Sequence, residues 1–209
     1  MRIDSLKTSP DRAGRYWVAF EDGSKLGLYR QTVEDFCLYA GKELTEEEYS
    51  RLLESAGQMS AKMRAVRIVS ASSVSRRDLR DRLVRKGEDP AQAEQAVAWM
   101  EELHLVDDRN TAEQVVHSCI SKGYGLARAK QALYEKQIPK EYWEDALADY
   151  PDQLDRIVSF LQNRLDANAG EKEVKRAIDA LLRRGHSYRL IRQGLDIISL
   201  DAEAFVEEF

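Results

Sequence analysis

The residues best suited to binding chemistry in this 209-residue chain are the lysines and arginines of one segment, residues 62–87. That segment holds nine cationic residues and only two acidic ones, Asp78 and Asp81, which leaves a surplus of seven positive charges. Arginine guanidinium groups present paired N–H donors that match the oxygens of phosphate and carboxylate groups. The segment therefore predicts a contact with an anionic partner. A solvated helix face, on which the charges bind nothing, is equally compatible with the sequence.

The rest of the chain has the opposite charge balance. Residues 88–150 hold thirteen acidic and six basic residues, and the whole chain has a formal net charge of -5. A basic segment beside an acidic one can orient a partner, or bind an anionic one locally. The negative total argues weakly against simple nucleic-acid binding by the chain as a whole.

Catalytic and metal-binding patterns are poor by comparison. The three histidines, His104, His117 and His186, are isolated, with no set of Cys or carboxylate ligands at metal-binding spacing. The turn Gly123-Tyr124-Gly125 lacks the further Gly and the Lys-Ser/Thr pair of a phosphate loop, so it is interpreted as a helix turn. The sequence thus predicts no catalytic residue, no metal and no cofactor, in a chain that is not an enzyme.

The two cysteines, Cys37 and Cys119, are too few and too far apart for a disulfide framework. Neither has a neighbouring His in sequence that would activate a thiol nucleophile. The N-terminal residues contain no apolar signal segment, and no apolar run approaches the roughly 20 residues that span a bilayer. We therefore expect reduced thiols, a cytoplasmic location, no membrane contact and a monomer.

A three-helix unit recurs three times, at a period of roughly fifty residues. Each copy contains a short amphipathic helix that ends in a basic residue and a turn: Leu79-x3-Leu83-x2-Lys86-Gly87, then Ala129-x3-Leu133-x2-Lys136-Gln137, then Ala177-x3-Leu181-x2-Arg184-Gly185. The following helix keeps step, with apolar or small residues six, nine and ten positions past each turn. Repeats of this kind form extended binding surfaces rather than closed catalytic pockets.

The first 58 residues differ from the repeats. Two runs rich in β-branched and aromatic residues, 16–20 and 25–29, flank Asp22-Gly23, which is a strong hairpin signal. Residues 3–8 are predicted as a third strand, followed by a turn at Ser9-Pro10-Asp11. The apolar residues of segment 31–40 fall on one face of a helix, so a helix is predicted there.

A further helix is predicted to begin after Thr45, with Glu48 completing a capping box, and to end near Gly57. The first repeat then has a helix over 61–70. No strand signal follows residue 60, and no helix needs to exceed about 17 residues, so a coiled coil is not expected.

Caps and breakers predict the remaining helix ends. Ser75 caps the second helix of the first repeat, which Gly87 stops, and Asp89 caps the third. Pro139 marks the start of the third helix of the second repeat, and a short tail helix is expected over 201–208.

These elements predict a mainly α fold. Three tandem three-helix repeats form an elongated, curved array, and a small N-terminal β-hairpin and helix region precedes them. The predicted boundaries are 1–58 for the N-terminal region, followed by 59–107, 108–150 and 151–209 for the three repeats.

Three stretches resemble those of a known family: Ser75-x2-Asp78-Leu79-x3-Leu83-x2-Lys86-Gly87, then Glu102-Leu103-x-Leu105-Val106-Asp107-Asp108, then Gly125-x2-Arg128-x4-Leu133-x2-Lys136-x-Ile138. In this order they resemble the RecX family of bacterial recombination regulators over residues 60–150. The N-terminal region resembles the extension of the longer Gram-positive members. Departures from the family pattern are Asp78 for Glu, Lys130 for Ile and Gln137 for Gly, which affect a cap, a helix face and a turn.

The resemblance implies a regulator of homologous recombination and DNA repair that binds the RecA filament in its groove. It would inhibit the ATPase and strand exchange of RecA, and modulate filament assembly. Single- or double-stranded DNA is a further expected partner. An alternative function is a nucleic-acid-binding helical module that acts without RecA. The residues expected at the partner or nucleic-acid contact are Arg76, Arg77, Arg80, Arg85, Lys86, Arg128, Lys130, Lys136, Arg183 and Arg184.

Overall fold

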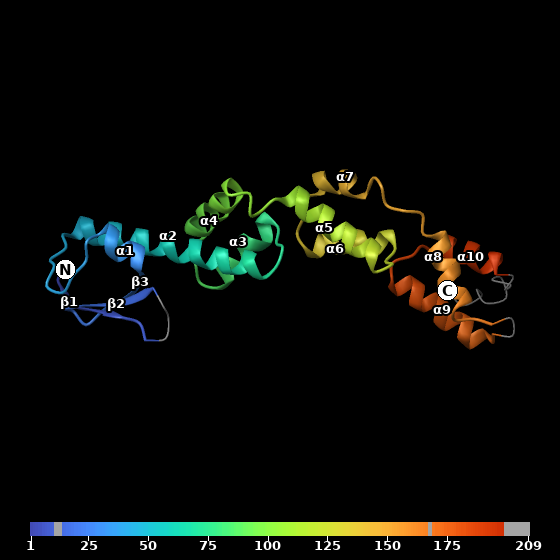
Figure 1. The fold of residues 1–209 in the computed structure, drawn as a ribbon, viewed down its shortest axis with the longest axis horizontal. Coiled ribbons are helices and arrows are strands. Elements are labelled where there is room, and N and C mark those ends of the chain that lie inside the picture. The colour runs from blue at the N-terminus through green and yellow to red at the C-terminus, as the bar shows by residue number, and fades with distance from the viewer. Residues whose placement is uncertain (11–13, 167–168, 199–209) are drawn as a thin grey trace. The chain divides into compact units, whose positions relative to one another are not determined.

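The structure is a computed structural model that describes residues 1–10, 14–166 and 169–198. It is mainly helical, with a small antiparallel sheet at the N-terminal end (Figure 1). The chain forms two compact units, unit 1 over Met1–Val106 and unit 2 over Asp107–Phe209. The predicted fold class, mainly α with an N-terminal β region, is confirmed.

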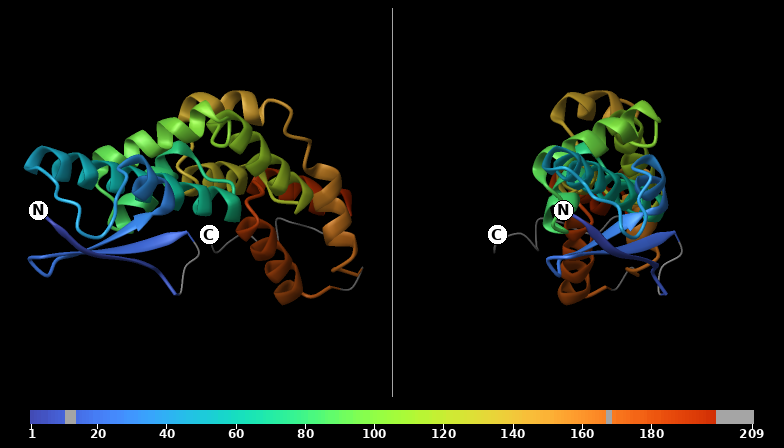
Figure 2. Two further views of the ribbon diagram at one scale, coloured as in Figure 1. Left: turned by 60° about the vertical axis from the view of Figure 1, so that its left-hand side comes forward. Right: turned by 90° about the vertical axis from the view of Figure 1, so that its left-hand side faces the viewer.

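The sheet of unit 1 contains β1 (Ile3–Thr8), β2 (Arg15–Phe20) and β3 (Lys25–Tyr29), in the order β1-β2-β3. The predicted hairpin is present: Gly23 adopts a φ of 84° between β2 and β3, and the Asp22 carboxylate accepts a hydrogen bond from the Ser24 amide at 2.9 Å. Helices cover one face of the sheet (Figure 2). The side chains buried beneath them include Val18, Phe20 and Leu28.

The first helix, α1 (Arg30–Asp35), is shorter than the predicted 31–40. Cys37 adopts a left-handed conformation, with a φ of 47°, immediately after the helix. The Leu38 amide then donates to the Val33 carbonyl oxygen at 2.9 Å, which turns the chain back and buries Leu38 in the core under the sheet. The apolar pattern therefore indicates burial correctly, but it does not predict the turn that buries its second half.

The second helix, α2 (Glu46–Ala71), joins what the sequence predicted as two helices, and its 26 residues exceed the predicted upper length. It begins with the predicted capping box, in which Thr45 and Glu48 exchange hydrogen bonds of 2.8 and 3.1 Å. Gly57 does not end the helix. A Cβ atom there would lie 2.3 Å from the side chain of Gln92, so the glycine admits that close contact instead.

The first repeat is completed by α3 (Arg76–Arg85) and α4 (Pro90–Glu102), which pack with the C-terminal part of α2. The predicted caps are confirmed: Ser75 Oγ accepts from the Asp78 amide at 3.1 Å, and the Asp89 carboxylate accepts from the Ala91 amide at 2.9 Å. Leu79 and Leu83 are fully buried, as their spacing predicted.

Unit 2 begins with α5 (Asp108–Ser121) and α6 (Leu126–Glu135). The third helix predicted from Pro139 is a 3-10 turn, Lys140–Tyr142, followed by the short α7 (Trp143–Leu147). The last segments are α8 (Leu154–Gln162), α9 (Glu171–Arg183) and α10 (Tyr188–Ile197), which share one hydrophobic cluster.

The turn that suggested the repeat has the same geometry in all three copies. Gly87, Gln137 and Gly185 have φ values of 89°, 55° and 84°, the left-handed conformation that reverses the chain after a helix. The amide of the next residue then donates to the carbonyl oxygen of the buried leucine five residues earlier, at 3.1 Å in each copy: Glu88 to Leu83, Ile138 to Leu133, and His186 to Leu181. The predicted repeat is therefore present in the backbone as well as in the sequence.

Several predictions concern features outside the described residues or remain open. The tail helix over 201–208 lies outside the described residues, as does Asp11 of the predicted turn after β1. The boundaries at 58, 107 and 150 and the curvature of the array stay predictions.

Candidate anion-binding site

The basic helix α3 directs two of the predicted contact residues toward α4. Arg76 lies 2.8 Å from a carboxylate oxygen of Glu94 and 3.5 Å from one of Glu101, and Arg80 lies 3.1 Å from the second oxygen of Glu94. All four side chains are substantially exposed. Such surface ion pairs contribute about 0–1 kcal/mol to stability each. Acidic side chains within the same repeat therefore balance the charges of Arg76 and Arg80.

Two further predicted contact residues, Arg77 and Arg85, are exposed. The Arg85 side chain donates through Nε to the Asp81 carbonyl oxygen at 3.2 Å, which holds it along its own helix. Both guanidinium groups remain accessible to a partner.

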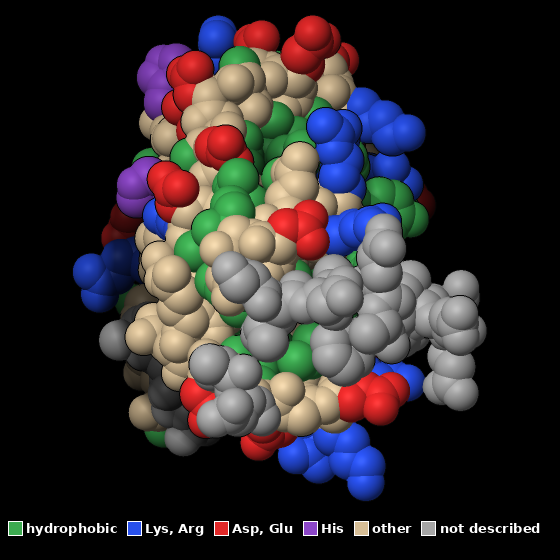
Figure 3. Space-filling view, turned by 90° about the vertical axis from the view of Figure 1, so that its right-hand side faces the viewer, with side chains coloured by type: hydrophobic (Ala, Val, Ile, Leu, Met, Phe, Trp, Pro, Cys, Tyr) green, Lys and Arg blue, Asp and Glu red, His purple; other side chains and the backbone are tan. Residues whose placement is uncertain are grey.

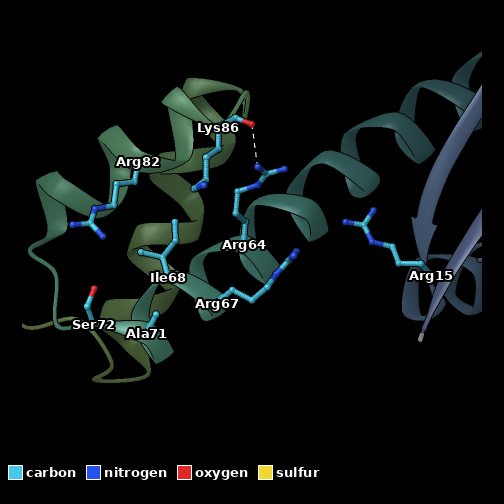
Figure 4. Close-up of a pocket in the computed structure, with 8 residues that line it drawn as sticks. All are labelled: Arg15, Arg64, Arg67, Ile68, Ala71, Ser72, Arg82 and Lys86. Carbon is cyan, nitrogen blue, oxygen red and sulfur yellow. Dashed lines mark hydrogen bonds between the residues drawn. The ribbon is translucent and has the colours of Figure 1, made fainter. Parts of the chain in front are cut away.

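The opposite side of α3 faces α2 and a cationic cavity of about 450 Å³. Figure 4 shows Arg64 and Arg67 of α2, Lys86 at the end of α3, and Arg15 of β2 pointing into the same space. The cavity lies within unit 1, and its lining residues are Arg15, Arg64, Arg67, Ile68, Ala71, Ser72, Arg82 and Lys86. We call it the cationic cavity.

Buried carboxylates balance two of its five cations. Arg64 Nε lies 2.5 Å from Glu88, which is 8% exposed, and Arg82 Nε lies 2.8 Å from Asp78, which is 7% exposed. Arg64 also donates to the Lys86 carbonyl oxygen at 3.0 Å, which fixes the end of α3 against α2. These contacts position the cavity wall, and they leave the other three cations of the cavity without an ion pair among the described residues.

Tyr29, at the end of β3, organises two of these three cations. Its phenolic oxygen accepts hydrogen bonds from Arg15 at 2.8 Å and from Arg67 at 2.9 Å. The Arg15 guanidinium also lies over the Tyr29 ring, at 3.9 Å from the ring centre. A cation over the face of an aromatic ring is held by attraction to the ring electrons. The third cation, Lys86, is exposed.

This arrangement suits an oxyanion with several oxygens. Arginine stays protonated at all physiological pH values, so the positive charge of the cavity is permanent. Guanidinium groups bind phosphate oxygens through paired N–H groups, and a lysine adds a point charge. A phosphate of a nucleic-acid backbone has this chemistry and is the ligand class that the cavity fits.

The sequence predicted only part of this site. Lys86 was among the predicted contact residues, whereas Arg64, Arg67 and Arg82 were counted in the basic segment but not selected. Arg64 and Arg67 are three residues apart, and Arg82 and Lys86 four, so each pair shares a helix face and could have been found. Arg15 carried no such signal, because its place beside Arg67 depends on packing of the sheet against α2.

In unit 2, the predicted residues of α6 do not form one site. Arg128 pairs with Glu135 at 2.9 Å, and this contact raises the pKa of Arg128 and lowers that of Glu135. Lys130 is exposed and Lys136 half-buried. In the space-filling view of Figure 3, Lys and Arg side chains occupy several separate places on the visible face, with Asp and Glu among them.

The predicted residues of α9 diverge in the same way. Arg183 is exposed, whereas Arg184 lies over the Phe160 ring at 5.0 Å and lines a second cavity of about 390 Å³ with Lys122, Arg156 and His186. The His186 ring is 6% exposed, and its Nε2 lies 3.2 Å from the Gly123 carbonyl oxygen. Burial, with a contribution from Arg184 and Arg156, lowers the pKa of His186.

Chemistry other than anion binding has little support in the described residues. They contain no cluster of three His, Cys, Asp or Glu side chains arranged to hold a metal ion. Burial raises the pKa of the Cys119 thiol, which keeps it in the unreactive protonated form. Over the described part of the chain, no helix has the length and apolar character needed to cross a bilayer.

Comparison with known proteins agrees with the motifs. The sequence model of one family, described as "RecX, second three-helix domain", matches residues 107–147. The regulatory protein RecX of Clostridioides difficile (strain 630) is 24% identical over 196 residues, which cover 93% of this chain and 89% of that protein. This chain belongs to the RecX family. A second RecX-family protein, the regulatory protein RecX of Cronobacter sakazakii, is 35% identical over 111 residues, covering 48% of this chain and 62% of the relative.

Solved RecX structures have the same fold. A crystal structure of regulatory protein RecX matches with a TM-score of 0.63 at 19% identity, covering 93% of this chain and 98% of the other. The RecX structure from Lactobacillus salivarius matches with a TM-score of 0.59 at 22% identity, covering 69% and 98% respectively. The RecX family is a non-enzymatic family of regulatory proteins.

Proposed function

We propose that this RecX-family protein binds the RecA nucleoprotein filament in its groove and inhibits ATP hydrolysis and strand exchange by RecA. In this role it modulates filament assembly during homologous recombination and DNA repair. Such a protein works in the cytoplasm, where the chromosomal DNA lies, and acts as a monomer. The regulatory role follows from the family. RecA as the partner, and binding in the filament groove, are what we propose.

The observation that carries the proposal is the cationic cavity, because its ligand class occurs along the whole length of a nucleoprotein filament. Arg15, Arg67 and Lys86 present positive charge that no acidic side chain balances among the described residues. The DNA in the filament supplies regularly spaced phosphates. The exposed cations Arg77 and Arg85 extend the same charge along α3.

The remaining predicted contact residues take different parts in this proposal. Arg76 and Arg80 mainly hold α3 against α4 within the first repeat, because their carboxylate partner Glu94 lies on α4. The predicted cations of unit 2, which include Lys130 and Arg183, add separate and weaker contacts to the filament. Repeated units suit this task because each can meet an equivalent place on a helical polymer.

RecA-catalysed ATP hydrolysis on single-stranded DNA tests the proposal directly. The purified protein at amounts stoichiometric with RecA is expected to lower the rate, and an unchanged rate would remove the proposal. The variant Arg67→Glu with Lys86→Glu reverses two cavity charges and is expected to weaken inhibition. Its matched control, Lys172→Glu with Arg176→Glu, reverses two exposed cations of α9 that lie outside the predicted contact set.

A second candidate function is a nucleic-acid-binding module that acts without RecA, and the phosphate-like chemistry of the cationic cavity favours it. Binding driven by phosphates weakens steeply with salt, with a slope of log K against log salt of about -0.9 per phosphate contact for duplex DNA. Titration of labelled single- and double-stranded DNA across salt concentrations, with no RecA present, tests it. Flat and weak binding to both would exclude this function.

A further inference from the structure

The outward face of the N-terminal sheet carries an unusual set of side chains. Strand alternation places Val18 and Phe20 under the helices, so the alternate residues of β2, Arg15, Trp17 and Ala19, leave the strand on the other face. Register then aligns Lys7 of β1 and Gly27 of β3 on either side of Trp17. No helix of unit 1 covers this face in Figure 2, and Trp17 is 52% exposed.

The indole of Trp17 lies against Gly27. A Cβ atom at residue 27 would be 3.2 to 3.6 Å from three atoms of the ring, so the glycine provides the space in which the ring packs on β3. A hollow of about 410 Å³ adjoins the indole, and its lining includes Ser5, Lys7 and Lys25. The Trp17 ring is thus supported from beneath and open on its outer side.

The paired positions of this face carry positive charge, and the exposed carboxylate of Asp4 lies beside them at the bulge of β1, outside the register pairs. The outward register positions of the three strands hold Ser5, Lys7, Arg15, Trp17, Ala19, Lys25, Gly27 and Tyr29, with three cations and no carboxylate among them. One exposed aromatic residue is ordinary on a protein surface. A supported, exposed indole between two lysines is a different arrangement, because it combines a stacking surface with attraction for a polyanion.

The same face continues into the cationic cavity. Arg15 is two residues before Trp17 on β2, so the two side chains leave the strand on the same side, roughly 6.8 Å apart along the strand, and the Arg15 guanidinium then reaches the cavity beside α2. The Arg15 guanidinium already stacks on Tyr29 and lines the cavity. A guanidinium plane, like an aromatic ring, is a surface on which a nucleic-acid base can stack.

We propose that this sheet face binds single-stranded nucleic acid, with one base stacked on Trp17 and the next on the Arg15 guanidinium. The backbone passes Lys7 and Lys25, and continues toward the phosphate-binding cations Arg67 and Lys86. This site deepens the proposed function by giving the N-terminal region a ligand of its own, and it needs no RecA.

Spacing and chemistry favour a single strand over other polyanions. Bases in one strand of a duplex rise by about 3.4 Å and stack on each other. The backbone positions of Trp17 and Arg15 are roughly 6.8 Å apart along the strand, a separation that suits bases that have been pulled apart. An acidic peptide matches the charge of Lys7 and Lys25 but offers no π-face to the indole.

Binding of fluorescein-labelled oligo-dT by the full-length protein, measured by anisotropy without RecA, tests the inference. Trp17→Ala is expected to weaken binding by about 5- to 150-fold, equivalent to about 1–3 kcal/mol for one stacked base, and Trp17→Phe to restore part of the loss. The control is Tyr134→Ala, which removes an exposed aromatic residue of unit 2, outside the sheet. This variant is expected to bind like the parent. Circular dichroism establishes that each variant is folded.

Two further arms identify the ligand and its position. Lys7→Glu with Lys25→Glu is expected to reduce the salt slope by about 0.7 for each phosphate that the variant no longer neutralises. Oligonucleotides carrying 5-bromouracil are expected to cross-link to the peptide that contains Trp17. Equal binding by Trp17→Ala, equal weakening in Tyr134→Ala, or displacement of oligo-dT by polyglutamate at equal charge would each overturn the inference.

The same variants separate this site from the proposed function. Weaker oligo-dT binding by Trp17→Ala supports the sheet site whether or not the parent inhibits RecA. A parent protein that leaves RecA ATPase unchanged overturns the proposed function, and says nothing against oligo-dT binding by the sheet.

Discussion

The guanidinium of Arg15 lies 3.9 Å over the ring of Tyr29, and the oxygen of the same tyrosine accepts a hydrogen bond from that arginine at 2.8 Å. Arg67, 38 residues further along the chain, donates to this oxygen as well, at 2.9 Å. One phenol thus joins the end of the sheet to the helix that runs through unit 1. It also holds two positive charges close together, which is favourable for anion binding and unfavourable for the free protein.

Tyr29→Phe tests this junction. The variant keeps the ring under Arg15 and removes the shared acceptor, so both guanidinium groups lose a fixed position. Oligo-dT and duplex DNA are expected to bind several-fold more weakly, and stability is expected to fall by only about 1 kcal/mol because the site is partly exposed. Fluorescence anisotropy and urea denaturation measure the two effects. Tyr39→Phe, at an exposed position in the same unit, is expected to change neither.

Charge reversal on the outer side of α3 tests the predicted partner surface. Arg77→Glu with Arg85→Glu is expected to weaken RecA or DNA binding while helicity and melting temperature stay nearly constant, since exposed charges contribute little to stability. Pull-down with RecA filaments, together with thermal melting followed by circular dichroism, gives both readouts. A large fall in melting temperature would mean that these side chains serve the fold.

Leu83→Ala is expected to have the opposite effect, with a loss of about 2–5 kcal/mol in the free energy of unfolding, because the side chain is fully buried in the first repeat. Val84→Ala changes the next residue of the same helix, which is 37% exposed, and is expected to cost less than about 0.5 kcal/mol. Urea denaturation of both variants measures the difference. Equal costs at the two positions would contradict the repeat register.

Gln137→Gly is expected to stabilise the protein by about 0.5–1 kcal/mol. Gln137 has a φ of 55° in the turn where the other two repeats have glycine, and a side chain in that conformation costs about 1–2 kcal/mol. The gain is smaller than this because glycine also loosens the unfolded chain. Gln131→Gly, within α6, is the control and is expected to destabilise by about 1 kcal/mol. Thermal and urea unfolding would show the opposite signs.

Stability is expected to fall as the pH drops below about 6.5, the ordinary pKa of histidine, because His186 has a lowered pKa in the folded state. Below this pH the unfolded chain binds a proton at His186 that the folded chain does not bind. The contribution of neutral His186 to the free energy of unfolding is therefore complete above about pH 6.5, and it is lost as the pH falls toward the lower pKa of the folded state. The difference in unfolding free energy between the parent and His186→Gln across this range measures it. His117→Gln, which replaces an exposed histidine of unit 2, is the matched substitution for comparison.

The sequence by itself determined the local elements of this protein. The Asp22-Gly23 turn, the Thr45 and Ser75 caps and the buried Leu83 all follow from residue type and spacing, and each is present in the structure. Motif order alone also led to the RecX family. These features depend on contacts between residues a few positions apart, so residue type and spacing are enough to predict them.

Tertiary structure decided which cations are available. Glu94 balances Arg76 and Arg80 from another helix, and Arg15 joins Arg67 from a strand some fifty residues earlier. The structure also shows α2 continuing through Gly57, where the Gln92 side chain packs closely. Charge pairing and close packing depend on distance in space, so a cationic residue in the sequence shows only the possibility of a site. The fold determines which of these charges are paired and which face a cavity together.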